Sequence, residues 1–193
     1  MVVAGAERAS STRILHSRSH VTHSPGSAAI SYLSPLLAVI VGIVHAALAP
    51  VIVVGGVKPN LVLVAVVLVT ALAGFMPGIT WAFVAGLTAN LLVGDPLGSV
   101  PLSMLLVATL VAGGARLLGR MVWIYPVLAA FAGSIVADVG SLLIGQLVGA
   151  APLAGLPTAL ILGAAVLNAG ITAAVLYPAR ALAARYVADE AGG

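Results

Sequence analysis

The sequence predicts an all-α polytopic membrane protein with six transmembrane helices and both ends in the cytoplasm. Of 193 residues, 62% are hydrophobic and only 7% are charged, whereas a soluble domain carries about 25% charged residues. The charges also separate long uncharged stretches, such as residues 19–57 and 139–179. This composition excludes a soluble globular domain and a disordered chain. The net charge of +3 does not indicate a nucleic-acid partner.

Each predicted span follows from the length of an uncharged stretch, since a transmembrane helix needs about 20 apolar residues. The stretch 60–93 is too long for one span, and Pro77 with its flanking glycines divides it. The spans are predicted at residues 30–54, 60–76, 77–93, 101–119, 122–148 and 156–177, followed by an amphipathic segment at 179–187. The short second and third spans leave two alternatives open, a single bent helix or a re-entrant hairpin.

The basic residues orient this arrangement. With a cytoplasmic N-terminus, six spans leave only Lys58 outside the cytoplasm. A single crossing over 60–93 would instead move four arginines outside, against the preference for basic residues in cytoplasmic loops. The basic residues predicted inside are Arg8, Arg13, Arg18, Arg116, Arg120, Arg180 and Arg185.

The ends differ in composition from the apolar domain at 30–187. Residues 1–29 are rich in serine, arginine and histidine, which predicts a flexible cytoplasmic tail, and residues 188–193 form a second, short tail. A cleaved signal peptide is the alternative for the N-terminus, because residues 47–49 read Ala-Leu-Ala. His16, His20 and His23 are interpreted as solvated side chains rather than as a metal site.

Polar residues within predicted spans are expensive in a membrane, so each is expected to have a partner. They are His45, Asn90, Asp138, Gln146 and Asn168. Asp138 lies in the fifth span with no intramembrane lysine or arginine to pair with. Two interpretations stay open for it: a contact with a partner subunit or a proton site, and an internal hydrogen bond that fixes helix packing.

Chemistry-bearing motifs are lacking. The sequence has no cysteine, no HExxH or GxSxG motif, no phosphate-binding loop and no paired acids. We therefore expect neither an enzyme nor a bound cofactor or metal. Ala82 and Gly86 lie four residues apart in the third span, a spacing that lets helix backbones approach closely.

Several motifs, in their order along the chain, resemble the rod-shape-determining MreD family. Lys58-Pro59-Asn60 is similar to the basic-Pro-Asn or basic-Pro-Asp turn that opens the family's second span. The segment 86–102 resembles the family's G-x-x-x-D-L-x-x-G-x-x-L-G signature, with Asn90 in place of the usual aspartate. The other matching positions are Gly86, Leu91, Gly94, Leu97 and Gly98, then Asp138 in the fifth span and Asn168, Pro178 and Arg180 in and after the sixth.

This resemblance implies a non-enzymatic inner-membrane subunit of the bacterial rod complex. Its main partner would be MreC, within a larger complex that includes MreB filaments, the RodA glycosyltransferase and a class B penicillin-binding transpeptidase. Its role would be to support peptidoglycan synthesis during lateral wall growth. The expected contact or packing residues are Pro59, Asn60, Ala82, Gly86, Asn90, Gly94, Gly98, Asp138 and Asn168.

The family is also similar in fold to the substrate-binding subunits of ECF-type vitamin transporters, which supplies the alternative function. A transporter subunit needs a pocket lined by several polar or aromatic side chains. Aromatic residues are only 5% of this chain, and the outer loops offer few polar groups beyond Lys58, Asp95 and Ser99. The sequence therefore favours the scaffold over the transporter.

Overall fold

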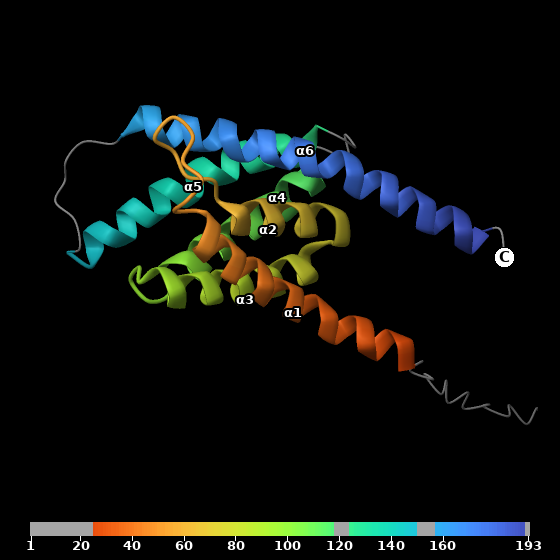
Figure 1. Cartoon of the computed structure of the whole chain (residues 1–193). Helices are drawn as coiled ribbons and strands as arrows, with labels where there is room; N and C mark the ends of the chain where they lie inside the picture. Colours follow the sequence, from red (N-terminus) through yellow and green to blue (C-terminus); the bar gives the residue numbers. More distant parts are fainter. Residues whose placement is uncertain (1–24, 118–123, 150–156, 192–193) are drawn as a thin grey trace, which may run out of the picture.

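Six α-helices make up the part of the chain that the computed structural model describes, which is residues 25–117, 124–149 and 157–191 (Figure 1). Besides one isolated bridge between Val54 and Val57, these residues contain no β-structure. The helices are α1 (Pro25–Leu48), α2 (Leu61–Ala73), α3 (Phe75–Val93), α4 (Ser99–Leu117), α5 (Tyr125–Leu147) and α6 (Thr158–Ala191).

The helices run alternately between two ends of the bundle. The start of α1, the turn between α2 and α3 and the end of α6 lie at one end (Figure 1). The C-terminal ends of α1, α3 and α5 lie at the opposite end. We call this second end the Lys58 end, because it carries Lys58 in the loop between α1 and α2.

The first helix is shorter at its C-terminus than the span predicted from the sequence. α1 ends at Leu48 instead of continuing to Val54. Pro50 follows two residues later, and proline lacks the N–H that would extend the helix. α1 also packs along α3, where Gly42 faces Thr88 and Ala85.

The stretch 60–93 forms two helices that fold back on each other. Gly74 separates them with φ of 99°, a left-handed conformation that suits glycine. Gly78 of α3 then lies directly against Thr70 of α2. The alternative of a single bent helix is therefore wrong, whereas two crossings and a re-entrant hairpin both fit this shape. α2 has 13 residues, about 20 Å at 1.5 Å per residue.

The last helix is longer than the predicted sixth span. α6 runs from Thr158 to Ala191 and passes through Pro178 without ending. The residues that follow Pro178 are mostly alanine, leucine and arginine, which favour helix strongly enough to continue it. The expected amphipathic segment at 179–187 is thus a continuation of α6, and most of the short tail at 188–193 is helical as well.

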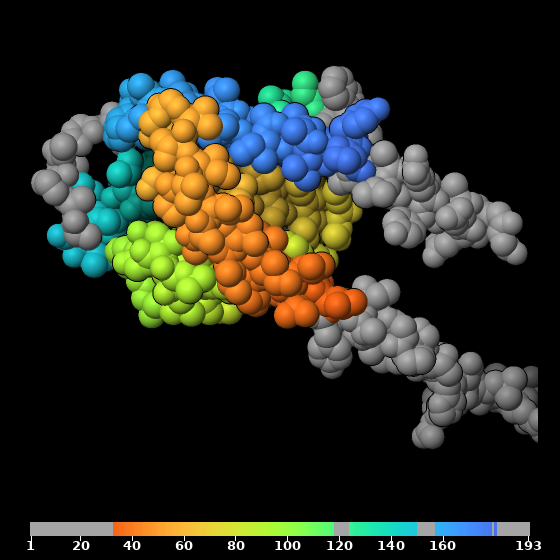
Figure 2. All heavy atoms as spheres, viewed as in Figure 1, coloured from red at the N-terminus to blue at the C-terminus, as the bar shows by residue number. Residues whose placement is uncertain are grey.

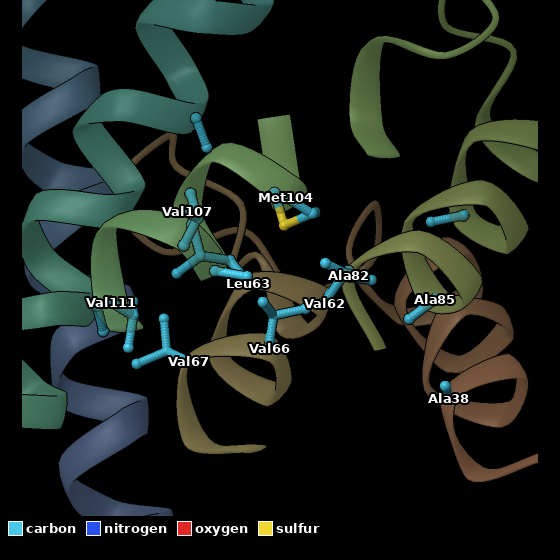
Figure 3. Packing of buried hydrophobic residues seen from close by; sticks show 14 residues of the cluster. Ala38, Val62, Leu63, Val66, Val67, Ala82, Ala85, Met104, Val107 and Val111 are labelled. Carbon is cyan, nitrogen blue, oxygen red and sulfur yellow. The ribbon is translucent and has the colours of Figure 1, made fainter. Parts of the chain in front are cut away.

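The shortest helix forms the centre of the bundle. α2 contacts each of the other five helices. Its side chains at positions 62, 63, 66 and 67 are fully buried, and in Figure 3 they meet those of α3 and α4. α1 and α3 come close through small residues, including Ala38 and Ala85 (Figure 3). Burial around α2 therefore holds the bundle together.

The outer surface is apolar. Large side chains such as Leu36, Phe83, Leu106 and Leu162 are about half exposed, on four different helices. Among the described residues, four helices are long and apolar enough to cross a membrane: Phe75–Val93, Ser99–Leu117, Tyr125–Leu147 and Thr158–Pro178. Leu33–Leu48 and Leu61–Ala73 are shorter apolar helices.

Candidate functional site

A chain of hydrogen bonds joins three helices near the start of α2. Asn60 caps α2, because its Oδ1 accepts from the backbone N–H of Leu63 at 3.0 Å. The backbone N–H of Asn60 donates to Oδ1 of Asn168 on α6 at 2.8 Å. Nδ2 of Asn168 donates to Oγ of Ser134 on α5 at 2.9 Å. Asn168 and Ser134 are each 1% exposed, so water cannot replace these bonds.

The loop before α2 is held in place by a tight turn. Val54 and Val57 exchange two backbone hydrogen bonds of 2.9 and 3.0 Å, and both intervening residues, Gly55 and Gly56, have positive φ. The loop rests on α6, where Val57 lies against Gly163. Figure 2 shows the same contact, with the light orange loop lying over blue α6. The turn thereby fixes where Lys58, Pro59 and Asn60 lie.

A cavity of about 450 Å³ opens beside this hydrogen-bonded chain. Its wall combines residues from α1, α3, α5, α6 and the loop. It brings together four of the residues expected from the sequence, Pro59, Asn60, Asp138 and Asn168, and adds Lys58 and His45. We call this the polar cavity. Pro59 is buried and Asn60 half-buried, so this turn faces the bundle interior more than a partner.

Asp138 lies on the wall of the polar cavity and is half-buried. Within the described residues, its carboxylate has no hydrogen bond or ion pair. In this arrangement Asp138 does not link α5 to another described helix through a hydrogen bond. Ser134, one turn earlier on the same helix, makes the interhelical bond to Asn168 instead.

Asn90 organises a second polar centre, the turn between α3 and α4. Its Nδ2 donates to the carbonyl oxygens of Asp95 and Pro96 at 3.1 and 3.3 Å, and its Oδ1 accepts from the backbone N–H of Gly98 at 2.6 Å. Gly94 ends α3 with φ of 78°, and Gly98 has φ of 91°. The two glycines allow the loop to fold back over Asn90, which is 1% exposed.

The hydrogen bonds of Asn90 predict what happens when it is replaced by the aspartate of the family signature. Replacing Asn90 by aspartate, the family's usual residue, should lower the free energy of unfolding by about 1–3 kcal/mol, because a carboxylate cannot donate to two carbonyl oxygens. Thermal unfolding of the detergent-solubilised protein measures the change. An Asn90→Asp protein that unfolds at the wild-type temperature would contradict the two hydrogen bonds that Nδ2 of Asn90 donates to the loop.

The small residues of α3 are used within the chain. Ala82 and Gly86 are both buried, and a Cβ on Gly86 would lie 2.9 Å from Cα of Pro101 on α4. These two residues therefore contact other helices of the same chain instead of offering their backbone to a partner. The exposed face of α3 carries larger side chains, including Phe83, Leu91 and Leu92.

The sequence did not predict that Ser134 bonds to Asn168, or that His45 lies in the wall of the polar cavity. A serine on an apolar helix gives little signal, although Ser134 lies one turn from Asp138. Among the described residues, no group of three histidine, aspartate or glutamate side chains could hold a metal ion. His16, His20 and His23 lie outside the described residues.

The fold and the apolar surface together define a helical membrane protein whose interior polar residues connect helices to loops. The chain belongs to the MreD family, since the model of the rod shape-determining protein MreD matches residues 27–183. This match covers nearly all of the helical bundle, and it supports a role in rod shape determination. Comparisons with curated proteins and with solved structures found no match.

Proposed function

We propose that this protein is a non-enzymatic subunit of the rod complex in the bacterial inner membrane. It binds MreC there, next to MreB filaments, RodA and a class B penicillin-binding transpeptidase, and it supports peptidoglycan synthesis during lateral wall growth. The observation that carries the proposal is the match to the MreD family over residues 27–183. The apolar outer surface supports it, because that surface suits contact with lipid and with other membrane helices.

The proposed topology has six crossings with both ends in the cytoplasm. The alternating helices support it, because Arg116 lies in the last turn of α4 and Arg180 in the second half of α6, and both helices run away from the Lys58 end (Figure 1). Positive residues prefer the cytoplasmic side, which places the Lys58 end outside. If α2 and α3 formed a re-entrant hairpin, α4, α5 and α6 would keep the same orientation.

A transporter subunit of the ECF type is the second candidate, and the polar cavity is the observation that favours it. The cavity gathers Lys58 and Asn60 with Asp138 and Asn168, which lie on helices far away along the sequence. Convergent polar groups of this kind are what a ligand site needs. Among the described residues, however, the wall has no tryptophan, tyrosine or phenylalanine, so these residues offer no stacking surface for a vitamin ring.

Purification from the native membrane separates the two candidates. The full-length protein carrying an affinity tag and extracted in mild detergent is expected to bring MreC with it at near-equal amount, as measured by mass spectrometry. An unrelated tagged protein with six membrane helices, expressed at the same level, is the control and should recover no MreC. Recovery of a pair of ATPase subunits in place of MreC would overturn the scaffold and support the transporter.

A further inference from the structure

The polar cavity continues into an apolar groove between α5 and α6. The groove has a volume of about 460 Å³, and its wall includes Leu142, Leu160 and Ile161. Lys58 and Asp138 belong to the walls of both the cavity and the groove. A polar compartment and an apolar one therefore meet at these two charged residues.

The charged and polar groups at this junction have unused binding capacity. Lys58 is exposed, Asp138 is half-buried, and neither makes an ion pair or hydrogen bond within the described part of the chain. Nδ1 of His45 is buried and also has no hydrogen-bond partner among the described residues. A buried polar atom such as Nδ1 of His45 is costly to leave unsatisfied. The opposite charges of Lys58 and Asp138 favour a ligand that supplies both a negative and a positive group.

The position of the cavity fits a lipid better than a soluble molecule. One side of its wall is built from the last turn of α1, the end of α3 and the loop that holds Lys58, all at the Lys58 end of the bundle, and the rest comes from Asp138 of α5 and from Ala164 and Asn168 of α6. Helix ends of a membrane protein lie near the level of the lipid head groups. The adjoining groove offers a surface of leucine and isoleucine side chains to an acyl chain.

We propose that the polar cavity binds the head group of a zwitterionic phospholipid with a primary ammonium, of the phosphatidylethanolamine class. Lys58 and His45 bind the phosphate, Asp138 accepts hydrogen bonds from the ammonium, and one acyl chain lies in the groove between α5 and α6. A primary ammonium is specified because it donates hydrogen bonds to a carboxylate, whereas the trimethylated ammonium of phosphatidylcholine has no N–H. This inference does not depend on MreC binding.

The test uses the full-length protein, delipidated in detergent, with thermal unfolding followed as each lipid is added. Dioleoyl phosphatidylethanolamine is expected to raise the unfolding temperature more than phosphatidylcholine or phosphatidylglycerol with the same chains. Asp138→Asn should remove the preference for phosphatidylethanolamine and weaken its apparent affinity by about tenfold or more, the equivalent of one charge-assisted hydrogen bond. Lys58→Gln should weaken the binding of phosphatidylethanolamine and phosphatidylglycerol alike.

Asp95→Asn is the control for the choice of lipid, because Asp95 is a carboxylate at the same end of the bundle that lies outside the walls of the cavity and the groove. Its charge acts on His45, so this variant can change the affinity for every phosphate-bearing lipid, and the measured quantity is the preference for phosphatidylethanolamine over phosphatidylcholine. Asp95→Asn should keep the wild-type preference. Equal stabilisation by phosphatidylethanolamine and phosphatidylcholine, or equal effects of Asp95→Asn and Asp138→Asn, would overturn the proposal. Soluble glycerophosphoethanolamine tests the groove, since stabilisation as strong as that by the whole lipid would exclude a bound acyl chain.

Discussion

Replacing Asn168 by leucine is expected to lower the free energy of unfolding by about 1–3 kcal/mol. Leucine has the same branched skeleton as asparagine and is larger, so the change removes the hydrogen bonds without opening a cavity. The backbone N–H of Asn60 and the hydroxyl of Ser134 both lose their partner, inside a bundle where water is scarce. The link from α2 to α5 and α6 is lost with them. Thermal unfolding in detergent measures the effect.

Two further variants show whether the effect comes from this chain of hydrogen bonds. Ser134→Ala removes one of the two bonds and should be less harmful than Asn168→Leu. Thr109→Val is the control, because the Thr109 hydroxyl is exposed and bonds only to the carbonyl of Leu105 in its own helix. An Asn168→Leu protein no less stable than Thr109→Val would show that the interhelical bonds contribute nothing.

Replacing Gly86 by alanine is expected to destabilise the bundle by about 1–3 kcal/mol, the usual cost of forcing an extra methyl group into a packed interior. The new Cβ would lie 2.9 Å from Cα and 3.3 Å from N of Pro101. Both are backbone atoms, so no side-chain rotation relieves the contact and α3 and α4 must move apart. The loss should appear as a lower unfolding temperature and a smaller yield of folded protein from the membrane.

Gly113→Ala is the matched control for this variant. Gly113 lies about one turn before the end of α4, and a Cβ there would meet nothing within 4 Å. Alanine favours helix over glycine by up to about 1 kcal/mol, so this variant should be neutral or more stable than the wild type. If Gly86→Ala behaved in the same way, close packing of α3 on α4 would not be what requires glycine.

The number and order of the helices could be predicted from the sequence because they depend on local signals. Uncharged stretches, Pro77 and the glycines around it place α2, α3, α4 and α5 within about three residues of their observed positions. The largest errors lie where proline acts in opposite ways. α1 ends two residues before Pro50, whereas α6 continues through Pro178 because strong helix formers follow that proline.

The candidate site was harder to predict because it depends on which helices are neighbours. Asn60 and Asn168 are 108 residues apart in sequence, and only the packing of α2 against α6 brings them into hydrogen-bonding distance. Lys58 and Asp138 share a cavity for the same reason. The small-residue face of α3 was recognised from its spacing, but the spacing could not show that Pro101 of the same chain covers Gly86.

The central position of α2 has a consequence for how the protein enters the membrane during synthesis. At about 20 Å, α2 is too short to span about 30 Å of hydrocarbon by itself. Four of its five neighbouring helices are made later, and α3 follows directly after Gly74. We therefore expect α2 and α3 to insert together as one helical hairpin, so that a ribosome paused before Val93 would leave α2 outside the lipid.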